Sequence, residues 1–264
     1  MWQSSRANSA AAFLAFVIAW CIASPAAAAE TGGTWPDQSE RYRACLALAH
    51  EKPGDGLAAA EDWRMGGGGF PAEHCAAVAL IGLKRYPEAA RRLEALAGAL
   101  MSSLPELRAG ALEQAGQAWL LAGDAKQAGS AFDAALTFRP DDPDLLIDRA
   151  QAHAEAKAWG PAIAALDRAL AVAPKRADAL IFRASAERQS NQTDRALADV
   201  EQALKLAPDT VPGLLERGNI RSLKGDLAGA RADWKRAETL EPNSPAGQAA
   251  HDNLARLAIG ERKP

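Results

Sequence analysis

Residues 156–174 read AKAWGPAIAALDRALAVAP, and the chain copies this stretch at a fixed spacing. The stretch ends at Pro174, and a proline stands again at the same place in the units before and after it. With 15 prolines in the chain, three such coincidences have a chance of roughly 2 in 10,000, and a period of about 34 residues is typical of solenoids. The columns are Pro140, Pro174, Pro208 and Pro242, then Ala128, Ala162, Ala196 and Ala230, and then Ala135, Ala169, Ala203 and Ala237.

Each unit is predicted to form two helices joined by a short turn. In residues 143–176, apolar and small side chains recur at helical spacing on both sides of a turn at residues 157–160. Pro161 suits the first turn of the second helix, where its missing N–H costs nothing, and Pro174 ends that helix. The neighbouring units have Gly-Asp at the turn, whereas the unit 177–210 has Asn191-Gln192, which is a weaker turn sequence.

Residues 109–142 resemble the tetratricopeptide repeat (TPR) family, whose pattern is W-x2-L-G-x2-Y, then A-x3-F, then P. The units 143–176, 177–210 and 211–244 keep the small residues and the proline without an insertion. The resemblance implies an all-α fold, a right-handed α-α superhelical solenoid of helix-turn-helix units. The matching residues of the first unit are Leu112, Ala115, Gly116, Trp119, Ala128, Phe132 and Pro140.

Three arginines depart from the family pattern in the first helix, at a position where leucine is expected: Arg149, Arg183 and Arg217. A variant of the family with arginine at this position is similar. There the arginine usually pairs with an acid on the second helix of its own repeat. The resemblance therefore implies a structural role, with acids such as Asp199 or Asp233 as partners.

The repeat pattern weakens toward both ends of the chain. Residues 39–108 are predicted to form degenerate TPR-like helical pairs that break at the four glycines 66–69. No Gly-Lys-Ser/Thr follows these glycines, so a linker is favoured over a phosphate loop. Residues 245–264 are predicted to form a capping helix and a tail, because one face is apolar and the opposite face is polar. The apolar face consists of Ala246, Ala250, Leu254 and Leu257.

Residues 1–29 have the pattern of a secretory signal peptide. Residues 10–22 form an unbroken apolar core, and three alanines precede Glu30. This core is shorter than the about 20 residues that span a bilayer. We therefore expect cleavage and export to the periplasm, with residues 30–38 as a flexible tail. The alternative is an uncleaved anchor, which is the only case in which a membrane contact is expected.

Two cysteines remain in the expected mature chain, Cys45 and Cys75. An even number of cysteines in an exported chain predicts a disulfide. The alternative is two buried thiols that act as small apolar groups. In the repeat register both cysteines fall in first helices of adjacent units, so a disulfide would join two poorly packed degenerate repeats.

Charge and motifs argue against several classes of function. Without Arg6 the chain has 29 basic and 33 acidic residues, a net charge of −4, which gives no reason to expect a nucleic-acid partner. The histidines at 50, 74, 153 and 251 lack metal-binding spacing, and there is no G-x-S-x-G motif. We therefore expect no enzyme, catalytic residue, cofactor, metal site or small-molecule substrate.

In the TPR family, first helices line a groove, and positions 5 and 9 of each unit point into it. The resemblance therefore implies a peptide groove with an apolar row at position 5, formed by Ile147, Ile181 and Leu215. An extended peptide would place side chains on this row and bond its backbone to a polar row at position 9. The alternative is that the apolar row packs against the neighbouring helix. The polar row is Gln117, Gln151, Ser185 and Asn219.

Two functions remain from the sequence. The favoured one is an exported bacterial TPR scaffold, without catalysis, that binds a protein or peptide partner in the cell envelope. The alternative is a structural or accessory subunit of an envelope assembly complex that binds through its flanks rather than its groove. Lysine and arginine are absent from positions 5 and 9, so acidic C-terminal peptides are poor candidates for the partner.

Overall fold

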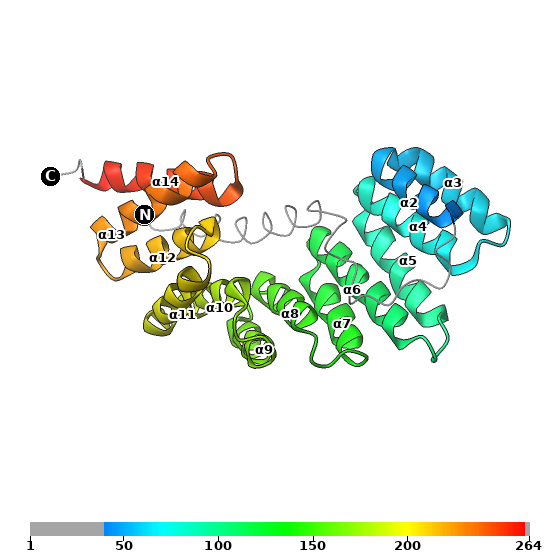
Figure 1. Cartoon of the computed structure of the whole chain (residues 1–264), viewed down its shortest axis with the longest axis horizontal. Coiled ribbons are helices and arrows are strands. Elements are labelled where there is room, and N and C mark those ends of the chain that lie inside the picture. Colours follow the sequence, from blue (N-terminus) through cyan, green and yellow to red (C-terminus); the bar gives the residue numbers. More distant parts are fainter. Residues whose placement is uncertain (1–39, 262–264) are drawn as a thin grey trace. The chain divides into compact units, whose positions relative to one another are not determined.

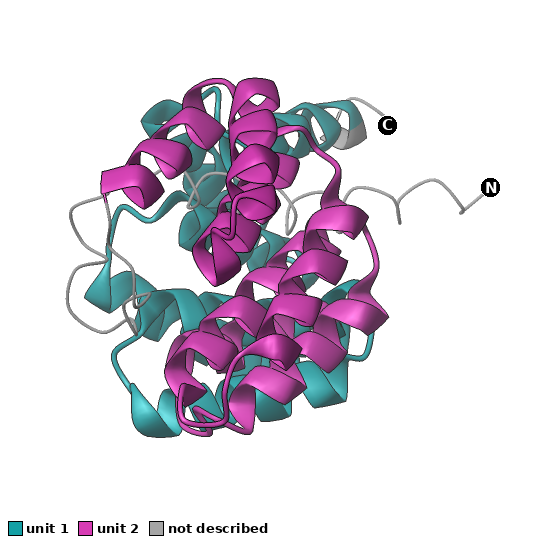
Figure 2. Ribbon diagram, turned by 90° about the vertical axis from the view of Figure 1, so that its right-hand side faces the viewer, with its two compact units in different colours: residues 1–23, 153–264 teal, residues 24–152 magenta. Residues whose placement is uncertain are grey.

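The computed structural model describes residues 40–261 as thirteen α-helices, and none of these residues forms a strand. They divide into two compact units, with residues 40–152 in unit 2 and residues 153–261 in unit 1 (Figure 2). The predicted signal peptide and the predicted tail at 30–38 lie outside the described residues.

Unit 2 is a stack of helices in which each helix from α2 to α6 packs on the next one along the chain (Figure 1). The helix α8, Pro143–Glu155, begins in unit 2 and ends in unit 1. The six complete helices of unit 2 are α2 (Glu40–Glu51), α3 (Pro53–Met65), α4 (Gly69–Gly82), α5 (Tyr86–Ala99), α6 (Pro105–Leu121) and α7 (Ala125–Leu136).

In unit 1, each helix from α9 to α13 also packs on the next one along the chain, and further contacts join α10 to α12 and α12 to α14. The predicted repeat boundaries at 109–142, 143–176, 177–210 and 211–244 stay predictions. The complete helices of unit 1 are α9 (Trp159–Val172), α10 (Ala177–Gln189), α11 (Thr193–Leu206), α12 (Val211–Leu223), α13 (Leu227–Leu240) and α14 (Pro245–Glu261).

The turn inside each repeat contains one residue with a left-handed backbone. Gly123 and Gly225 have φ of 77° and 85°, and the aspartate after each accepts a backbone N–H from the first turn of the next helix, at 3.0 and 2.9 Å. Lys157 and Asn191 take the same place in their repeats, with φ of 58° and 64°. Because this conformation costs a residue with a Cβ roughly 1 kcal/mol or more, the packing of the repeat imposes it where the local sequence does not favour it.

Small residues on the first helix accommodate large ones on the second. A Cβ on Gly116 would lie 2.5 Å from Cε1 of Phe132, and a Cβ on Gly218 would lie 2.5 Å from Nε1 of Trp234. Phe132 and Trp234 follow their glycines at the same distance in the sequence, so the same contact recurs in two repeats. In the repeat where the first helix has Ala184 instead of glycine, the equivalent residue of the second helix is Val200, which is smaller than Phe132 or Trp234. Ala184 and Val200 belong to one buried cluster.

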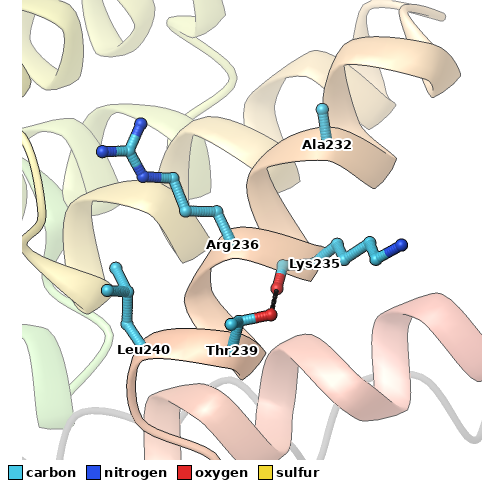
Figure 3. Close-up of a pocket in the computed structure, with 5 residues that line it drawn as sticks. All are labelled: Ala232, Lys235, Arg236, Thr239 and Leu240. Atoms are coloured by element: carbon cyan, nitrogen blue, oxygen red, sulfur yellow. Dashed lines mark hydrogen bonds between the residues drawn. The ribbon is translucent and has the colours of Figure 1, made fainter.

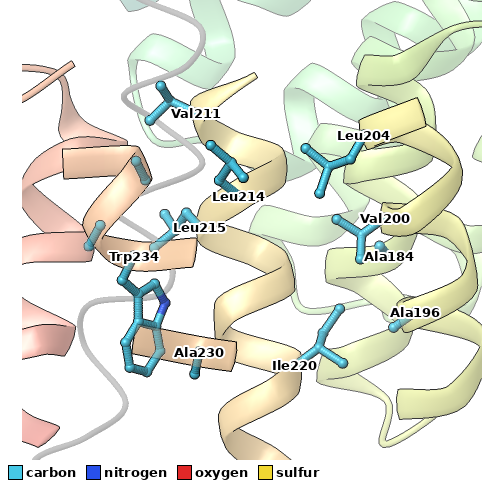
Figure 4. Packing of buried hydrophobic residues seen from close by; sticks show 12 residues of the cluster. Ala184, Ala196, Val200, Leu204, Val211, Leu214, Leu215, Ile220, Ala230 and Trp234 are labelled. Atoms are coloured by element: carbon cyan, nitrogen blue, oxygen red, sulfur yellow. The ribbon is translucent and has the colours of Figure 1, made fainter. Parts of the chain in front are cut away.

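The core of unit 1 runs along α10 to α13 and ends on α14 (Figure 4). Its large buried side chains come from both helices of successive repeats, so neighbouring repeats share one core. Ala250 on α14 is fully buried in this cluster, while Ala246, Leu254 and Leu257 pack against it. The apolar face predicted for this segment therefore rests on the preceding helices.

The sulfur atoms of Cys45 on α2 and Cys75 on α4 are bonded, with the two Cα atoms 6.2 Å apart. The predicted pairing is therefore present, and it joins the first helices of adjacent pairs. Between α3 and α4 the chain turns at Gly67 and Gly69, which have positive φ. None of the helices within residues 40–261 has the length and apolar composition needed to cross a membrane.

Candidate functional site

The apolar row at position 5 lies inside the stack. Ile147, Ile181 and Leu215 are only 4%, 9% and 7% exposed. The Cδ1 atom of Ile181 on α10 lies 3.3 Å from the point that a Cβ on Gly213 of α12 would occupy. Packing against a neighbouring helix therefore accounts for the burial of Ile181. Contact between the row and a peptide stays a prediction.

Two members of the polar row at position 9 hold neighbouring helices together. The Gln117 amide donates to Oδ2 of Asp148 at 3.1 Å, which joins α6 to α8. Oδ1 of Asn219 accepts the indole N–H of Trp234 at 3.2 Å and the amide of Asn253 at 2.8 Å. A ligand that used these two amides would have to compete with bonds inside the protein. The other two members are half-buried Gln151 and buried Ser185.

A second set of side-chain bonds crosses the first helices of unit 2. The Tyr42 hydroxyl on α2 lies 2.7 Å from Nδ1 of His74 on α4, and Nε2 of His74 lies 2.8 Å from Oε1 of Gln114 on α6. Because the Gln114 oxygen only accepts, Nε2 carries the proton and Nδ1 accepts from tyrosine. Burial lowers the pKa of His74 to about 4, so the ring is neutral at physiological pH. Three consecutive first helices are thus connected by one polar chain.

An ion pair makes the equivalent connection in unit 1. The Arg188 guanidinium on α10 donates to both carboxylate oxygens of Glu216 on α12, at 2.5 and 3.2 Å. Burial opposes the charged form of Arg188, but the Glu216 carboxylate outweighs it and raises the pKa of the arginine. A bidentate pair of this kind fixes orientation as well as distance, so it sets how α10 and α12 meet.

Unit 2 also contains a crowded group of carboxylates near the start of α8. Burial raises the pKa of Asp148 to about 7; the Gln117 amide opposes this change, and the charges of Glu113 and Asp144 add to it. Nη2 of Arg139 donates to Oε2 of Glu113 at 2.5 Å. Burial of Asp148 therefore favours the protonated form of its carboxyl group.

Glu187 on α10 is a comparable group in unit 1. It is 1% exposed, and burial followed by the charge of Asp199 raises its pKa to about 7. Its Oε1 lies 3.1 Å from Nε of Arg195, while Oε2 has no hydrogen-bond partner among residues 40–261. The side chain therefore exchanges a proton near neutral pH, which links the stability of unit 1 to pH.

A shallow hollow lies on the outer side of α13, and this helix provides all of the residues that line it (Figure 3). The Thr239 hydroxyl donates to the backbone oxygen of Lys235 at 2.8 Å. Within the described residues, no three His, Cys, Asp or Glu side chains come together as metal ligands would. The hollow is thus a surface feature of a second helix, lined by Ala232, Lys235, Arg236, Thr239 and Leu240.

Family models for the tetratricopeptide repeat match residues 120–186 and 177–210. Residues 120–210 therefore belong to the tetratricopeptide repeat family. No curated protein sequence matches it significantly. The two TPR matches overlap and together span residues 120–210, which include the turns at Gly123, Lys157 and Asn191.

Solved structures with the same architecture are TPR proteins of low sequence identity. The structure of MamA from residue 41 to its end, from Desulfovibrio magneticus RS-1, is 17% identical, with a TM-score of 0.54, over 78% of this chain and 98% of the solved MamA chain. YrrB is 18% identical, with a TM-score of 0.52, over 69% and 91%. TTC0263 of Thermus thermophilus is 23% identical, with a TM-score of 0.52, over 59% and 84%. These likenesses support the predicted all-α TPR solenoid.

The arginines at position 7 of the TPR repeats bind the second helix as the resemblance implied. Arg183 donates to both oxygens of Asp199 at 2.6 and 2.9 Å, and Arg217 donates to both oxygens of Asp233 at 2.9 and 2.6 Å. Both partners follow their arginines at the same sequence separation, on the second helix of the same repeat. The structural interpretation of these two arginines is therefore confirmed.

Acids of the preceding TPR repeat also pair with these arginines, and they were not among the predicted partners. Nε of Arg149 lies 2.6 Å from Oδ1 of Asp133, and Nη1 of Arg183 donates to Oδ1 of Asp167 at 2.8 Å. Both acids precede their arginines by the same separation at which Asp199 follows Arg183. This second regular spacing was visible in the sequence, and it would have predicted ion pairs between repeats as well as within them.

Proposed function

We propose that the protein is an exported, non-catalytic TPR scaffold that binds a protein or peptide partner in the cell envelope. The observation that carries this proposal is the TPR stack itself, in which consecutive repeats present equivalent side chains at regular positions. Repetition of this kind suits an extended partner, because each repeat can contact one segment of it. YrrB, a structural neighbour, is described as a TPR protein with an unusual peptide-binding site.

Export rests on the sequence of residues 1–29. The expected outcome is a mature chain that begins at Glu30 and is recovered from the periplasmic fraction. Mass spectrometry of the N-terminal peptide from fractionated cells tests this. A chain that keeps residues 1–29 and sediments with membranes would replace the periplasmic assignment with an anchored one.

A second candidate is an accessory subunit that binds through its flanks. The burial of the position 5 row favours it, because those side chains are already in contact inside the stack. Exposed apolar side chains instead recur at the ends of successive second helices of unit 1. They are Val172, Leu206 and Leu240, which are 48%, 43% and 43% exposed and stand at the same position of successive repeats.

Two sets of charge variants distinguish the candidates. Gln151→Arg and Gln189→Arg alter half-buried positions of first helices, whereas Leu206→Glu and Leu240→Glu alter exposed positions of second helices. Partners are captured by photo-crosslinking in the native cell and identified by mass spectrometry. Loss of the wild-type crosslinks in the first set alone supports the first-helix surface. Loss in the second set alone supports the flank, and unchanged crosslinks in both sets would contradict both candidates.

A further inference from the structure

The first helix pair, α2–α3, rests on α4 through a layer of small side chains. Apart from Tyr42 and Trp63, the buried members of this cluster are five alanines and two cysteines. The cluster in unit 1 also contains five alanines, but its other seven buried members are leucine, valine, isoleucine and tryptophan. Because hydrophobic stabilisation follows the apolar area removed from water, alanines contribute little of it. Leu46, Leu57 and Val78 pack against the cluster but are only partly buried, so fewer large side chains are fully buried between α2–α3 and α4 than in the unit 1 cluster.

Two specific bonds cross this contact, and they lie side by side. Cys45 is bonded to Cys75, and the Tyr42 hydroxyl donates to Nδ1 of His74 at 2.7 Å. Tyr42 and Cys45 are three residues apart, so they share one face of α2, while His74 and Cys75 are consecutive on α4. One disulfide and one hydrogen bond thus hold the same strip of α2.

Ion pairs add a smaller connection at the edge. Nη1 of Arg92 on α5 lies 2.6 Å from Oε1 of Glu61 on α3, and Nε of Arg64 lies 3.6 Å from Oε1 of Glu73. All four side chains are partly exposed to solvent, where such pairs contribute little. Because these ion pairs contribute little, the disulfide is the strongest single restraint that holds α2–α3 on α4.

We propose that the Cys45–Cys75 disulfide is a redox latch that keeps α2–α3 folded over α4. The bond closes a segment with a sequence separation of 30, and in the chain-entropy model closure of a loop of that length favours the folded state by roughly 500-fold in the folding equilibrium constant. Reduction removes this factor, so that α2–α3 is held by packing, by the Tyr42–His74 hydrogen bond and by the partly exposed ion pairs. The helix pair α2–α3 is then released, and the face of α4 that carries fully buried Cys75 is uncovered.

The reduction requires a dithiol reductant. One of its thiolates attacks the sulfur of Cys45, the S–S bond breaks, and Cys75 leaves as a thiolate that takes up a proton. The second thiol of the reductant then attacks the mixed disulfide and releases Cys45 as a thiol. Two electrons and two protons reach the protein, and the reductant becomes a cyclic disulfide.

Hydrogen exchange and thiol alkylation of the full chain, with and without dithiothreitol, test the latch. On reduction, we expect amide exchange in residues 40–65 to accelerate by roughly tenfold or more, while residues 105–136 keep their protection. Iodoacetamide should then modify the peptide that contains Cys75 at a rate near that of unfolded protein. Peptide mass spectrometry reads both signals separately for each segment.

Two variants provide matched controls. Cys45→Ala should reproduce the reduced state without a reductant, and adding dithiothreitol should change nothing further. Tyr42→Phe keeps the disulfide and removes only the hydrogen bond, so residues 40–65 should stay protected while it is oxidised. The latch is refuted if reduced protein and Cys45→Ala both keep Cys75 unreactive. It is equally refuted if residues 105–136 lose protection together with residues 40–65, because the pair would not then be separately detachable.

Discussion

Replacing Ile181 with aspartate tests whether the position 5 row is part of the stack or an open binding surface. Ile181 is 9% exposed and lies against the backbone of α12 at Gly213. Loss of a buried isoleucine costs about 1.5–3 kcal/mol of apolar burial, and an unpaired buried polar group costs about 1–3 kcal/mol more. We therefore expect Ile181→Asp to lower the free energy of unfolding by about 2.5–6 kcal/mol.

Urea unfolding followed by far-ultraviolet circular dichroism measures this loss, and two variants calibrate it. Ile181→Val removes one methylene at the same site and should cost about 1 kcal/mol. Val172→Asp places the same charge at a side chain that is 48% exposed, where the cost should stay within about 1 kcal/mol. If Ile181→Asp costs no more than Val172→Asp, the burial argument is wrong. The peptide-groove assignment of Ile147, Ile181 and Leu215 would then be favoured.

Three further predictions concern the turns, the repeat packing and pH. Lys157→Gly should raise the free energy of unfolding by about 1 kcal/mol, because glycine adopts the left-handed backbone without strain. Gly123→Ala should lower the free energy of unfolding for the same reason, and thermal melts of the two variants test both expectations. Gly218→Ala should cost about 1–3 kcal/mol through overpacking against Trp234, and adding Trp234→Leu should recover part of that loss in the same melts. The pKa of Glu187 is raised from 4.5 to about 7, so its contribution to the free energy of unfolding is fully present below pH 4.5 and is lost as pH rises through about 7. Glu187→Gln should therefore reduce the fall in the free energy of unfolding between pH 5 and 8 by about 1–3 kcal/mol. Urea titrations at several pH values measure this fall, and an unchanged fall in the variant would contradict the prediction.

The repeat architecture was predictable because its causes are local and periodic. A proline that ends each second helix and a small residue that admits the neighbouring helix recur at one spacing, as Pro174 and Ala162 do. The ion pairs of Arg183 and Arg217 were predictable for the same reason, since each partner stands at a fixed separation. The left-handed backbone at Lys157 was harder to predict, because lysine does not favour this conformation and the packing of the repeat determines it.

The candidate site was less predictable, because an apolar row has the same sequence pattern whether a neighbouring helix or a ligand covers it. The row at Ile181 is buried in the stack, and only the structure shows the covering helix. The bonds of His74 to Tyr42 and Gln114 join residues 32 and 40 positions apart. These separations differ from the repeat period, so no column of the sequence reveals them.

The bonds between first helices bear on where a partner binds. In unit 2 they run from Tyr42 through His74 to Gln114, and in unit 1 Arg188 binds Glu216. Each of these polar groups is already paired, so a peptide that used it would replace a protein–protein hydrogen bond and gain only the difference. A partner that covers the ends of the second helices replaces no such hydrogen bond. Apolar side chains such as Leu206 are removed from water there, which favours binding. The energetic balance therefore favours the flank over the polar residues of the first helices as the source of affinity.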